Sequence, residues 1–328
     1  MAREAAKALA VVILAAGEGT RMRSEKHKVL HEAAGRPLLE HILRAIDPLN
    51  PEHVVVVVGF SGDKVRERFK DTPVNFVTQD FSTGYGTGHA LMQTEAAFQD
   101  FKGDVLVLNG DGPLLKTSTL QALVAKQKAE PGMTLVTCKF SDPTGMGRIV
   151  RDNANKLAAI IEEKDADAEQ KKITEINPGV YIFDESVFEK CKSLKNDNAS
   201  GEYYITDLPG LYLAAGQRVG TLLIPDETEV LGINNRKQLA HIDRILRDRI
   251  RDKWLIEGVT MVSPEQTFID DTVALGRDVV LEPGVILKGA TRIGAGATIG
   301  AYAHLNNCHV KAGAWVPPHT VCEGQELG

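Results

Sequence analysis

The sequence predicts an α/β fold in which a doubly wound parallel sheet is followed by a short parallel β-helix of six-residue repeats. In the first two-thirds of the 328 residues, short β-branched runs alternate with helix-like segments, the pattern of a parallel sheet covered on both faces. After Gly258, apolar residues recur at every sixth position, a period that neither an α-helix nor a β-hairpin has. The change of pattern predicts two architectures along one chain.

Four short apolar runs bounded by Gly, Pro or Asp are expected to form buried strands, and two segments between them have helical periodicity. In a doubly wound sheet, ligands bind beyond the carboxyl ends of the strands. We therefore expect functional residues in the loops that follow the first strand and Leu108. The expected strands are 11–14, 54–58, 105–108 and 135–137, and the expected helices are 38–46 and 117–128.

The C-terminal repeat consists of two apolar series with the same spacing, and glycines occupy many of the turns. A coil with three short faces of six residues each has this period. The register slips by one residue at Val310 and Val316 and the pattern fades in Pro317-Pro318, so we expect only a few coils. Because such coils expose apolar faces, we predict an oligomer. The two series are Ile269, Leu275, Leu281, Leu287, Ile293, Ile299, Leu305 and Val273, Val279, Val285, Thr291, Ala297, Ala303.

Between the two architectures, residues 235–254 predict a charged helix with a single apolar stripe. Such a helix either packs on its own domain or connects two domains. We expect a first domain at 1–236, a connecting helix at 237–257 and the repeats at 258–328. The residues of the stripe are Leu239, Ile242, Leu246 and Ile250.

The composition excludes several classes of partner. A net charge of −6 gives no global positive field for nucleic acid or anionic lipid, so any phosphate must be held locally. No run approaches the roughly 20 apolar residues that span a bilayer, and the run 8–16 is better explained as a buried strand than as a signal peptide. None of the four cysteines forms a CxxC pair, so we expect reduced thiols and a cytoplasmic protein.

The segment 14–22, LAAGEGTRM, directly follows the first expected strand. Glycines at such a turn let backbone N–H groups hold phosphate oxygens, although a merely tight turn has the same GxG pattern. A dinucleotide-binding loop would need a third glycine where Met22 stands, which weakens an oxidoreductase interpretation. Arg21 lies in the loop and Lys28 follows it, so these cations are either donors to a polyphosphate or solvated surface bases.

A second element, NGDGP at 109–113, has Asp111 at the carboxyl end of an expected strand. A carboxylate held between two glycines suits a hard cation such as Mg²⁺, and the alternative role is a turn or helix cap. Asn234 precedes the charged helix, where it would either complete a metal site or cap that helix.

Nine motifs occur in one order along roughly residues 10–310: LAAGEGTRM, KVLHEAAGRPLLEHIL, GTGHA, NGDGPLL, DPTGMGRI, IIEEKDA, INPGVYIF, GEYYITD and GINNR. Together they resemble the uridyltransferase half of the bacterial N-acetylglucosamine-1-phosphate uridyltransferases, enzymes usually bifunctional with a glucosamine-1-phosphate acetyltransferase. The resemblance implies a Rossmann-like nucleotidyltransferase domain and a left-handed β-helix of hexapeptide repeats that assembles as a trimer. It also implies transfer of UMP from UTP to N-acetylglucosamine 1-phosphate by Mg²⁺-assisted in-line displacement, giving UDP-N-acetylglucosamine and pyrophosphate.

The resemblance implies roles for individual residues. Arg21 and Lys28 would act on the phosphate chain, and Asp111 and Asn234 would bind Mg²⁺. The residues implied to read the uracil edge are Gln79, Gly86 and Thr87. Those implied to hold the N-acetylglucosamine group are Gly147, Glu162 and Asn177, near Tyr204 and Thr206. The full set of implied substrate-binding residues is Leu14, Ala15, Ala16, Gly17, Lys28, Gln79, Gly86, Thr87, Asn109, Gly110, Asp111, Gly147, Glu162, Asn177 and Asn234.

Two features depart from the family pattern. Between Gln79 and Gly86 the chain has about two residues more than the usual spacing, which alters the base-reading loop. The long acetyltransferase β-helix is absent, and the histidines of the repeat are not in a matching context, so we expect no acetyltransferase activity. Two alternatives remain: the same fold acting on another sugar 1-phosphate and nucleoside triphosphate, or a non-catalytic nucleotide-sugar-binding assembly protein. The histidines in question are His304, His309 and His319.

Overall fold

The computed structural model describes residues 7–59, 61–129 and 131–328. These residues form two compact units. Unit 1 comprises the described residues up to Leu30 together with Leu39–Gly232, and unit 2 comprises His31–Leu38 and Ile233–Gly328. The division expected at residues 236 and 257 stays a prediction.

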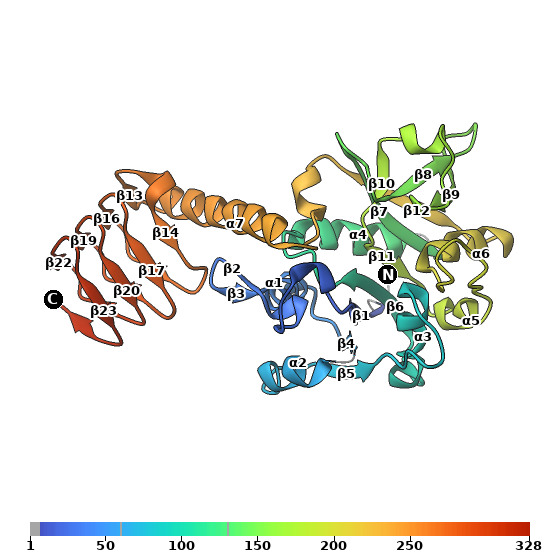
Figure 1. Ribbon diagram of the computed structural model, residues 1–328, viewed down its shortest axis with the longest axis horizontal. Helices are drawn as coiled ribbons and strands as arrows, with labels where there is room; N and C mark the ends of the chain where they lie inside the picture. The colour runs from blue at the N-terminus through green and yellow to red at the C-terminus, as the bar shows by residue number, and fades with distance from the viewer. Residues whose placement is uncertain (1–6, 60, 130) are drawn as a thin grey trace, which may run out of the picture. The chain divides into compact units, whose positions relative to one another are not determined.

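Unit 1 is built on one sheet whose strand order is β5-β4-β1-β6-β11-β7-β10-β8-β9, with β12 also paired to β7 (Figure 1). All four predicted strands are present, within β1, β4, β6 and β7. The strands are β1 (Ala8–Ala15), β4 (His53–Val58), β5 (Asn75–Thr78), β6 (Gly103–Asn109), β7 (Met133–Lys139), β8 (Gly147–Arg151), β9 (Leu157–Ile161), β10 (Glu175–Asn177), β11 (Tyr181–Phe183) and β12 (Val219–Ile224).

The sheet is parallel only in part, which corrects the expectation of a wholly parallel sheet. Strands β5, β4, β1 and β6 are parallel. Strand β11 pairs antiparallel with both β6 and β7, and β8 pairs antiparallel with β9. The turn at 152–156 between β8 and β9 is too short for the crossover of a dozen or more residues that a parallel pair requires. The sheet is therefore mixed and Rossmann-like.

Helices cover both faces of the sheet, and alternate residues of each central strand point to opposite faces. Val11 and Ile13 of β1 lie in a buried cluster with residues of α1 and α4. Val12 lies in a second cluster with residues of α3, α5 and α6. Burial on both sides explains why β1 is apolar at nearly every position. The helices are α1 (Leu38–Ile46), α2 (Gly62–Arg68), α3 (Thr87–Met92), α4 (Thr117–Ala129), α5 (Val187–Cys191) and α6 (Leu208–Ala214).

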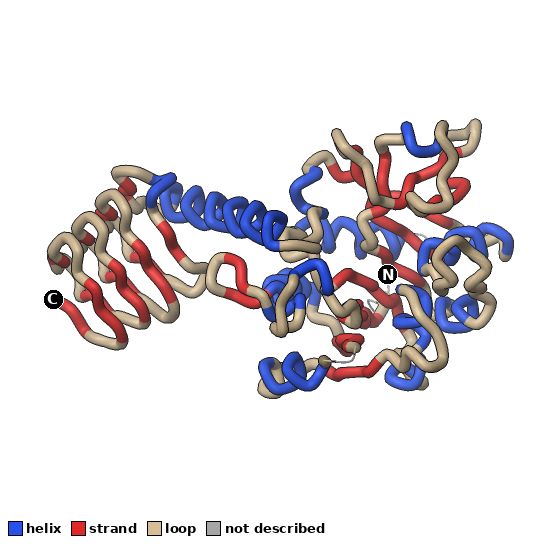
Figure 2. Tube along the Cα trace, viewed as in Figure 1, coloured by secondary structure: helices blue, strands red, loops and turns tan. Residues whose placement is uncertain are grey.

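Unit 2 contains the charged helix predicted from the sequence, α7 (Arg236–Ile256), and the predicted coil of short strands (Figure 2). Ile242, Leu246 and Ile250 of the predicted stripe are buried. The strands are β2 (Glu32–Ala33), β3 (Arg36–Pro37), β13 (Thr260–Met261), β14 (Phe268–Ile269), β15 (Ala274–Leu275), β16 (Val280–Leu281), β17 (Ile286–Lys288), β18 (Arg292–Ile293), β19 (Thr298–Ile299), β20 (His304–Asn306), β21 (His309–Val310), β22 (Trp315–Val316), β23 (Val321–Glu323) and β24 (Glu326–Leu327).

Strands β13–β24 form three parallel sheets, each of which takes one strand from every coil. This arrangement is consistent with the left-handed parallel β-helix implied by the resemblance. The predicted fading of the repeat at Pro317-Pro318 is wrong, because β23 and β24 continue the coil. Leu281 pairs with Ile299, 18 residues further along the chain, whereas Ile293 pairs with Val310, only 17 residues further along. One coil corner is thus a residue shorter, and this produces the slip in register.

No helix in the described part of the chain is both long enough and apolar enough to cross a membrane. The four cysteines, all within the described residues, are buried and carry free thiols.

The β2–β3 hairpin, which lies early in the chain, is bound within unit 2 by polar contacts. The Arg36 side chain contacts Asp271 at 2.5 Å, and the backbone N–H of Ala34 donates to Asp243 at 2.7 Å. Between them, Gly35 has a φ of +82°, and a Cβ atom there would lie 2.4 Å from Cγ of Asp270. Only glycine fits this turn, because any other residue would combine an unfavourable backbone conformation with a steric clash.

The steric part of this constraint can be separated from the backbone part by a matched pair of substitutions. Gly35→Ala is expected to lower the free energy of unfolding by about 3 kcal/mol, from strain plus overpacking. Gly258 also has a positive φ, of +93°, but a Cβ atom there would meet no protein atom within 4 Å. Gly258→Ala is therefore expected to cost only about 1 kcal/mol. Denaturant titration of both variants measures the difference; equal losses would contradict the packing of the hairpin described above.

Candidate active site

The site is built at the carboxyl ends of two neighbouring parallel strands. Leu14 of β1 lies beside Asn109 of β6, and the N–H of Gly110 donates to the carbonyl oxygen of Leu14 at 2.8 Å. The loops that leave these strands therefore begin side by side. This is the edge of the sheet where ligands bind in doubly wound folds.

The turn after β1 brings a lysine to this edge. Gly19 has a φ of +65°, and a Cβ atom there would lie 2.8 Å from Cβ of Lys28. Glycine at this position thus allows both the left-handed turn and the close approach of Lys28. Met22, which occupies the place of the missing third glycine, is 1% exposed and packs in the core instead of lining a nucleotide site.

Lys28 and Asp111 meet directly across the two loops. Nζ of Lys28 lies 2.5 Å from Oδ2 of Asp111, and both side chains are mostly buried, at 13% and 26% exposure. The residue expected to bind phosphate and the residue expected to bind a cation thus compensate the charge of one another. A pair that is only partly hydrated is held more strongly than a surface ion pair.

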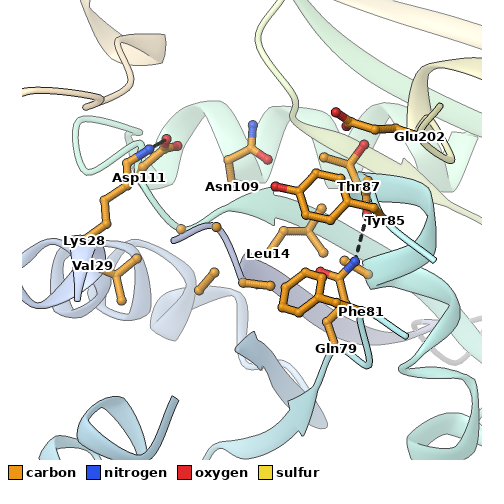
Figure 3. A pocket seen from close by; sticks show the side chains of 16 residues that line it. Leu14, Lys28, Val29, Gln79, Phe81, Tyr85, Thr87, Asn109, Asp111 and Glu202 are labelled. Carbon is orange, nitrogen blue, oxygen red and sulfur yellow. Dashed lines mark hydrogen bonds and ion pairs between the residues drawn. The ribbon is translucent and has the colours of Figure 1, made fainter. Parts of the chain in front are cut away.

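A first cavity of about 270 Å³ opens over the β1 loop (Figure 3). A Cβ atom at Gly17 would meet no protein atom within 4 Å, so the backbone there is open to a ligand. Eleven of the residues implied by the resemblance line this cavity: Leu14, Ala15, Ala16, Gly17, Lys28, Gln79, Gly86, Thr87, Asn109, Gly110 and Asp111.

Five further residues that line this cavity were not named as site residues from the sequence: Val29, Phe81, Tyr85, Ala90 and Glu202. Phe81 and Tyr85 belong to the segment between Gln79 and Gly86, and their ring centroids lie 5.5 Å apart. Glu202 lies in the GEYYITD motif and also lines the cavity. Figure 3 shows Tyr85, Thr87 and Glu202 on the same side of the cavity, away from Lys28 and Asp111. The unusual spacing was the only signal for the two aromatic residues.

A second cavity of about 250 Å³ adjoins the first, and the two share Thr87, Asn109 and Asp111. Its lining includes the remaining polar residues that the resemblance implies for the sugar, namely Gly147, Glu162 and Asn177, together with Thr206. The two cavities therefore meet at the end of β6. Residues that sequence reasoning did not single out, such as Met146, Val180 and Tyr181, complete the lining.

The polar groups of the second cavity are held in defined orientations. Glu162 accepts a hydrogen bond from the Thr206 hydroxyl at 3.0 Å, and the Asn177 amide donates to the Tyr181 hydroxyl at 2.6 Å. Burial raises the pKa of Glu162 above its usual value, and the nearby carboxylates, of which Asp165 is the strongest, raise it further. A carboxylate kept in such surroundings is costly for the fold and is typical of a functional site.

Three residues named from the sequence lie outside both cavity linings. Arg21 is exposed in the 3-10 turn Thr20–Met22, and Tyr204 is half-buried. Asn234 belongs to unit 2, and its role as a metal ligand stays a prediction. The alternative role of helix cap is taken by the next residue, because the side chain of Asn235 accepts from the N–H of Gln238 at 2.9 Å.

Because the fold disfavours the charged form of Glu162, we predict that the free energy of unfolding depends on pH. Because its pKa is higher in the folded than in the unfolded chain, the free energy of unfolding falls as pH rises from the unfolded value of about 4.5 through the folded pKa. Glu162→Gln removes this fall, so the variant should be more stable than the parent near neutral pH, with a difference that shrinks on acidification.

Glu163 is a matched control, because its pKa is shifted in the direction opposite to that of Glu162. Arg148 lies 2.6 Å from Glu163 and lowers the pKa of that carboxyl, so Glu163 stabilises the fold above its unfolded pKa and this contribution is lost on acidification. Glu163→Gln should therefore destabilise the protein at neutral pH. Denaturant titrations between pH 4 and 8 measure both variants; a pH-independent effect of Glu162→Gln would contradict the assignment.

Comparison with known proteins identifies the family. Residues 11–204 match the model of the MobA-like NTP transferase domain. The chain is 45% identical to the bifunctional protein GlmU of Thermus thermophilus over 316 residues, which is 96% of this chain and 69% of that protein. It is 43% identical to the bifunctional protein GlmU of Thermobifida fusca, over 99% of this chain and 68% of the relative, and 42% identical to that of Syntrophotalea carbinolica, over 97% and 68%. With a matching fold, two adjoining cavities and this similarity, the chain is a nucleotidyltransferase that belongs to the bifunctional GlmU family.

Proposed function

We propose that the chain transfers UMP from UTP to N-acetylglucosamine 1-phosphate, giving UDP-N-acetylglucosamine and pyrophosphate. The observation that carries this proposal is the pair of adjoining cavities that share Thr87, Asn109 and Asp111. A nucleotide beside Gly17 and a sugar phosphate beside Glu162 would meet at these shared residues. That junction is where the new bond to the α-phosphorus would form.

The proposed reaction requires two anions to come together. The phosphate oxygen of the sugar phosphate attacks the α-phosphorus in line with the departing pyrophosphate, and a phosphate dianion needs no general base to do so. Lys28 would leave Asp111 and bind the phosphate chain of the nucleotide, so that a cation already held at the junction compensates the charge of the substrates. Arg21 would contribute to the same phosphate chain, as the resemblance implies.

The residues fit a magnesium ion that is shared with the substrate. Mg²⁺ commonly binds one or two carboxylates and takes its other ligands from phosphate oxygens and water. The described residues contain no cluster of three or more His, Cys, Asp or Glu side chains that could hold an ion alone. Asp111 would therefore hold the ion together with the substrate once Lys28 has left it. The bound ion would supply positive charge to the phosphate oxygens.

The second cavity favours a sugar that carries an amide group. Glu162 and Asn177 are fixed by hydrogen bonds to Thr206 and Tyr181, so the cavity offers an oriented acceptor and an oriented amide. Such groups recognise a substrate N–H and carbonyl and are left unpaired by a sugar that lacks them. N-acetylglucosamine 1-phosphate is therefore favoured over glucose 1-phosphate.

A panel of substrates tests the proposed reaction. Pyrophosphate release should be fastest with UTP and N-acetylglucosamine 1-phosphate, and glucose 1-phosphate should lower kcat/KM on the order of 10²-fold. A faster reaction with dTTP or with glucose 1-phosphate would replace the proposed substrates by another pair on the same fold.

The role of Lys28 is tested against a neighbouring lysine. Lys28→Ala is expected to lower kcat on the order of 10²-fold, because it removes the cation at the junction of the cavities. Lys26 lies in the same segment but is exposed and outside both cavity linings, so Lys26→Ala should keep a near-normal rate. Steady-state pyrophosphate release measures both variants. Equal rates for the two would refute the role proposed for Lys28.

We also propose that the β-helix mediates self-association, as a trimer by the resemblance. Large apolar side chains are exposed on unit 2, including Tyr302 at 58%, Trp315 at 65% and Val321 at 80%. Exposed apolar patches of this kind commonly mark interfaces. Trp315→Glu is expected to shift the assembly toward smaller species in light scattering after size exclusion. A monomeric parent protein would contradict this proposal.

Acetyl transfer is not part of the function proposed for these 328 residues. His319 is stacked on Tyr302 with ring centroids 5.4 Å apart, so this imidazole is engaged in the coil itself. Release of CoA from acetyl-CoA in the presence of glucosamine 1-phosphate would overturn this expectation. Because UTP is a cytoplasmic nucleotide, the proposed reaction belongs to the cytoplasm.

A further inference from the structure

A chain of hydrogen bonds runs through a buried histidine to the wall of the first cavity. Nε2 of Gln79 lies 3.2 Å from the carbonyl oxygen of Gly86 and 3.1 Å from Nδ1 of His89. The other ring nitrogen, Nε2, lies 3.1 Å from the hydroxyl of Thr83. That hydroxyl lies 2.9 Å from the carbonyl oxygen of Asp80. Gln79 and His89 are each only 4% exposed.

The donor and acceptor of each hydrogen bond in this series follow from its two ends. These are the backbone carbonyl oxygens of Asp80 and Gly86, which can only accept. Because the carbonyl of Asp80 accepts from the Thr83 hydroxyl, that hydroxyl must itself accept from Nε2–H of His89. Neutral histidine carries one proton, so its Nδ1 is the acceptor for Gln79. Because the carbonyl oxygen of Gly86 can only accept, the group of Gln79 that lies 3.2 Å from it must be the amide nitrogen, which donates to both Gly86 and His89.

We propose that His89 is a positioning residue that fixes the side-chain amide of Gln79 so that its Oε1 atom faces the cavity and selects bases with an N–H at the pairing edge. This inference rests on the proposed function, because it concerns the nucleotide of that reaction. Gln79 lines the cavity, and among the described residues no donor contacts its Oε1 atom. Figure 3 shows the amide nitrogen of Gln79 at one end of a dashed line, and the amide donates to the carbonyl oxygen of Gly86.

The chemistry of the bases explains the selection. Uracil has an N–H between its two carbonyl groups, which an amide oxygen can accept. Cytosine has a lone pair at the same ring position and an amino donor where uracil has an acceptor. An amide rotated by half a turn would offer its NH₂ group and favour cytosine instead. Which atom faces the cavity therefore decides the base, and His89 is one of the two groups that decide it.

The surroundings of His89 keep its imidazole ring neutral, as the hydrogen bonds to Thr83 and Gln79 require. Burial lowers the pKa of His89 below its usual value and outweighs the opposing effect of Asp80. The ring of Tyr203 packs beside it, with centroids 6.0 Å apart. The amide of Gln93 lies 3.4 Å from Nε2 of His89, a longer contact that is met by turning the Gln93 oxygen toward the ring.

Substitutions at position 89 test the inference through the ratio of kcat/KM for UTP and CTP. His89→Asn keeps an acceptor near the position of Nδ1, whereas His89→Gln keeps a polar group only near Nε2. The UTP preference should fall about 10-fold in His89→Leu and His89→Gln, by the loss of one hydrogen bond, and stay within about 2-fold of the parent in His89→Asn. The control Gln93→Ala removes the longer contact to Nε2 of His89, leaves the Thr83 contact in place and should leave the ratio unchanged.

A purely structural role would give a different result. If His89→Leu and His89→Gln lower kcat/KM for UTP and CTP equally, or if His89→Asn behaves like His89→Gln, the inference is overturned. If His89→Leu does not fold, the comparison of the Asn and Gln variants still decides. The KM for the sugar phosphate should not change in any of these variants, because the second cavity is not lined by His89.

Two measurements test the role of His89 without requiring the protein to catalyse the proposed reaction. Nitrogen NMR of histidine-labelled protein should show His89 with its proton on Nε2; a proton on Nδ1 would overturn the inference. Calorimetry should show the same change in UTP over CTP preference as the kinetic ratio. A preference for binding UTP over CTP that falls in His89→Leu and His89→Gln, without any pyrophosphate release from the parent protein, would refute the proposed reaction and still support the role of His89, so the two failures are distinguishable.

Discussion

The contact between Lys28 and Asp111 connects the architecture of this protein to its chemistry. It joins two loops that are 83 residues apart in sequence, and it exists because β1 and β6 are parallel neighbours whose ends open on the same edge of the sheet. Each side chain compensates the charge of the other. In the proposed reaction, substrates that bring phosphate and a divalent cation would take over both partners at once, so that no isolated charge would be buried.

In the proposed function, the two cavities would divide substrate recognition between groups held by hydrogen bonds. On the nucleotide side, the chain from Asp80 through His89 to Gln79 fixes one amide. On the sugar side, Glu162 is kept near other carboxylates at a cost to the fold. In both places specificity comes from polar groups whose orientation is set before a ligand arrives, which is how a small cavity can discriminate by hydrogen bonding.

Local features of the sequence were sufficient to predict many of the residues that line the two cavities, whereas the long-range contacts between them could not be predicted. The Gly17 turn and Asp111 were predicted because a glycine turn after a strand and a carboxylate at a strand end are local signals. Which partner Lys28 contacts depends on the order of strands, and the role of His89 depends on how a loop folds back on α3. The period of six predicted the β-helix, but the shortened corner before Val310 concealed the coils beyond it.

The exchange of partners at Lys28 and Asp111 is tested most directly by a crystal structure with a non-hydrolysable UTP analogue and Mg²⁺. The account predicts the base beside Gln79, the phosphates over the Gly17 turn with Nζ of Lys28 on a phosphate oxygen, and the carboxylate of Asp111 turned to the cation. An analogue bound away from the Gly17 turn, or a contact between Lys28 and Asp111 that stays closed with the nucleotide and ion in place, would contradict it.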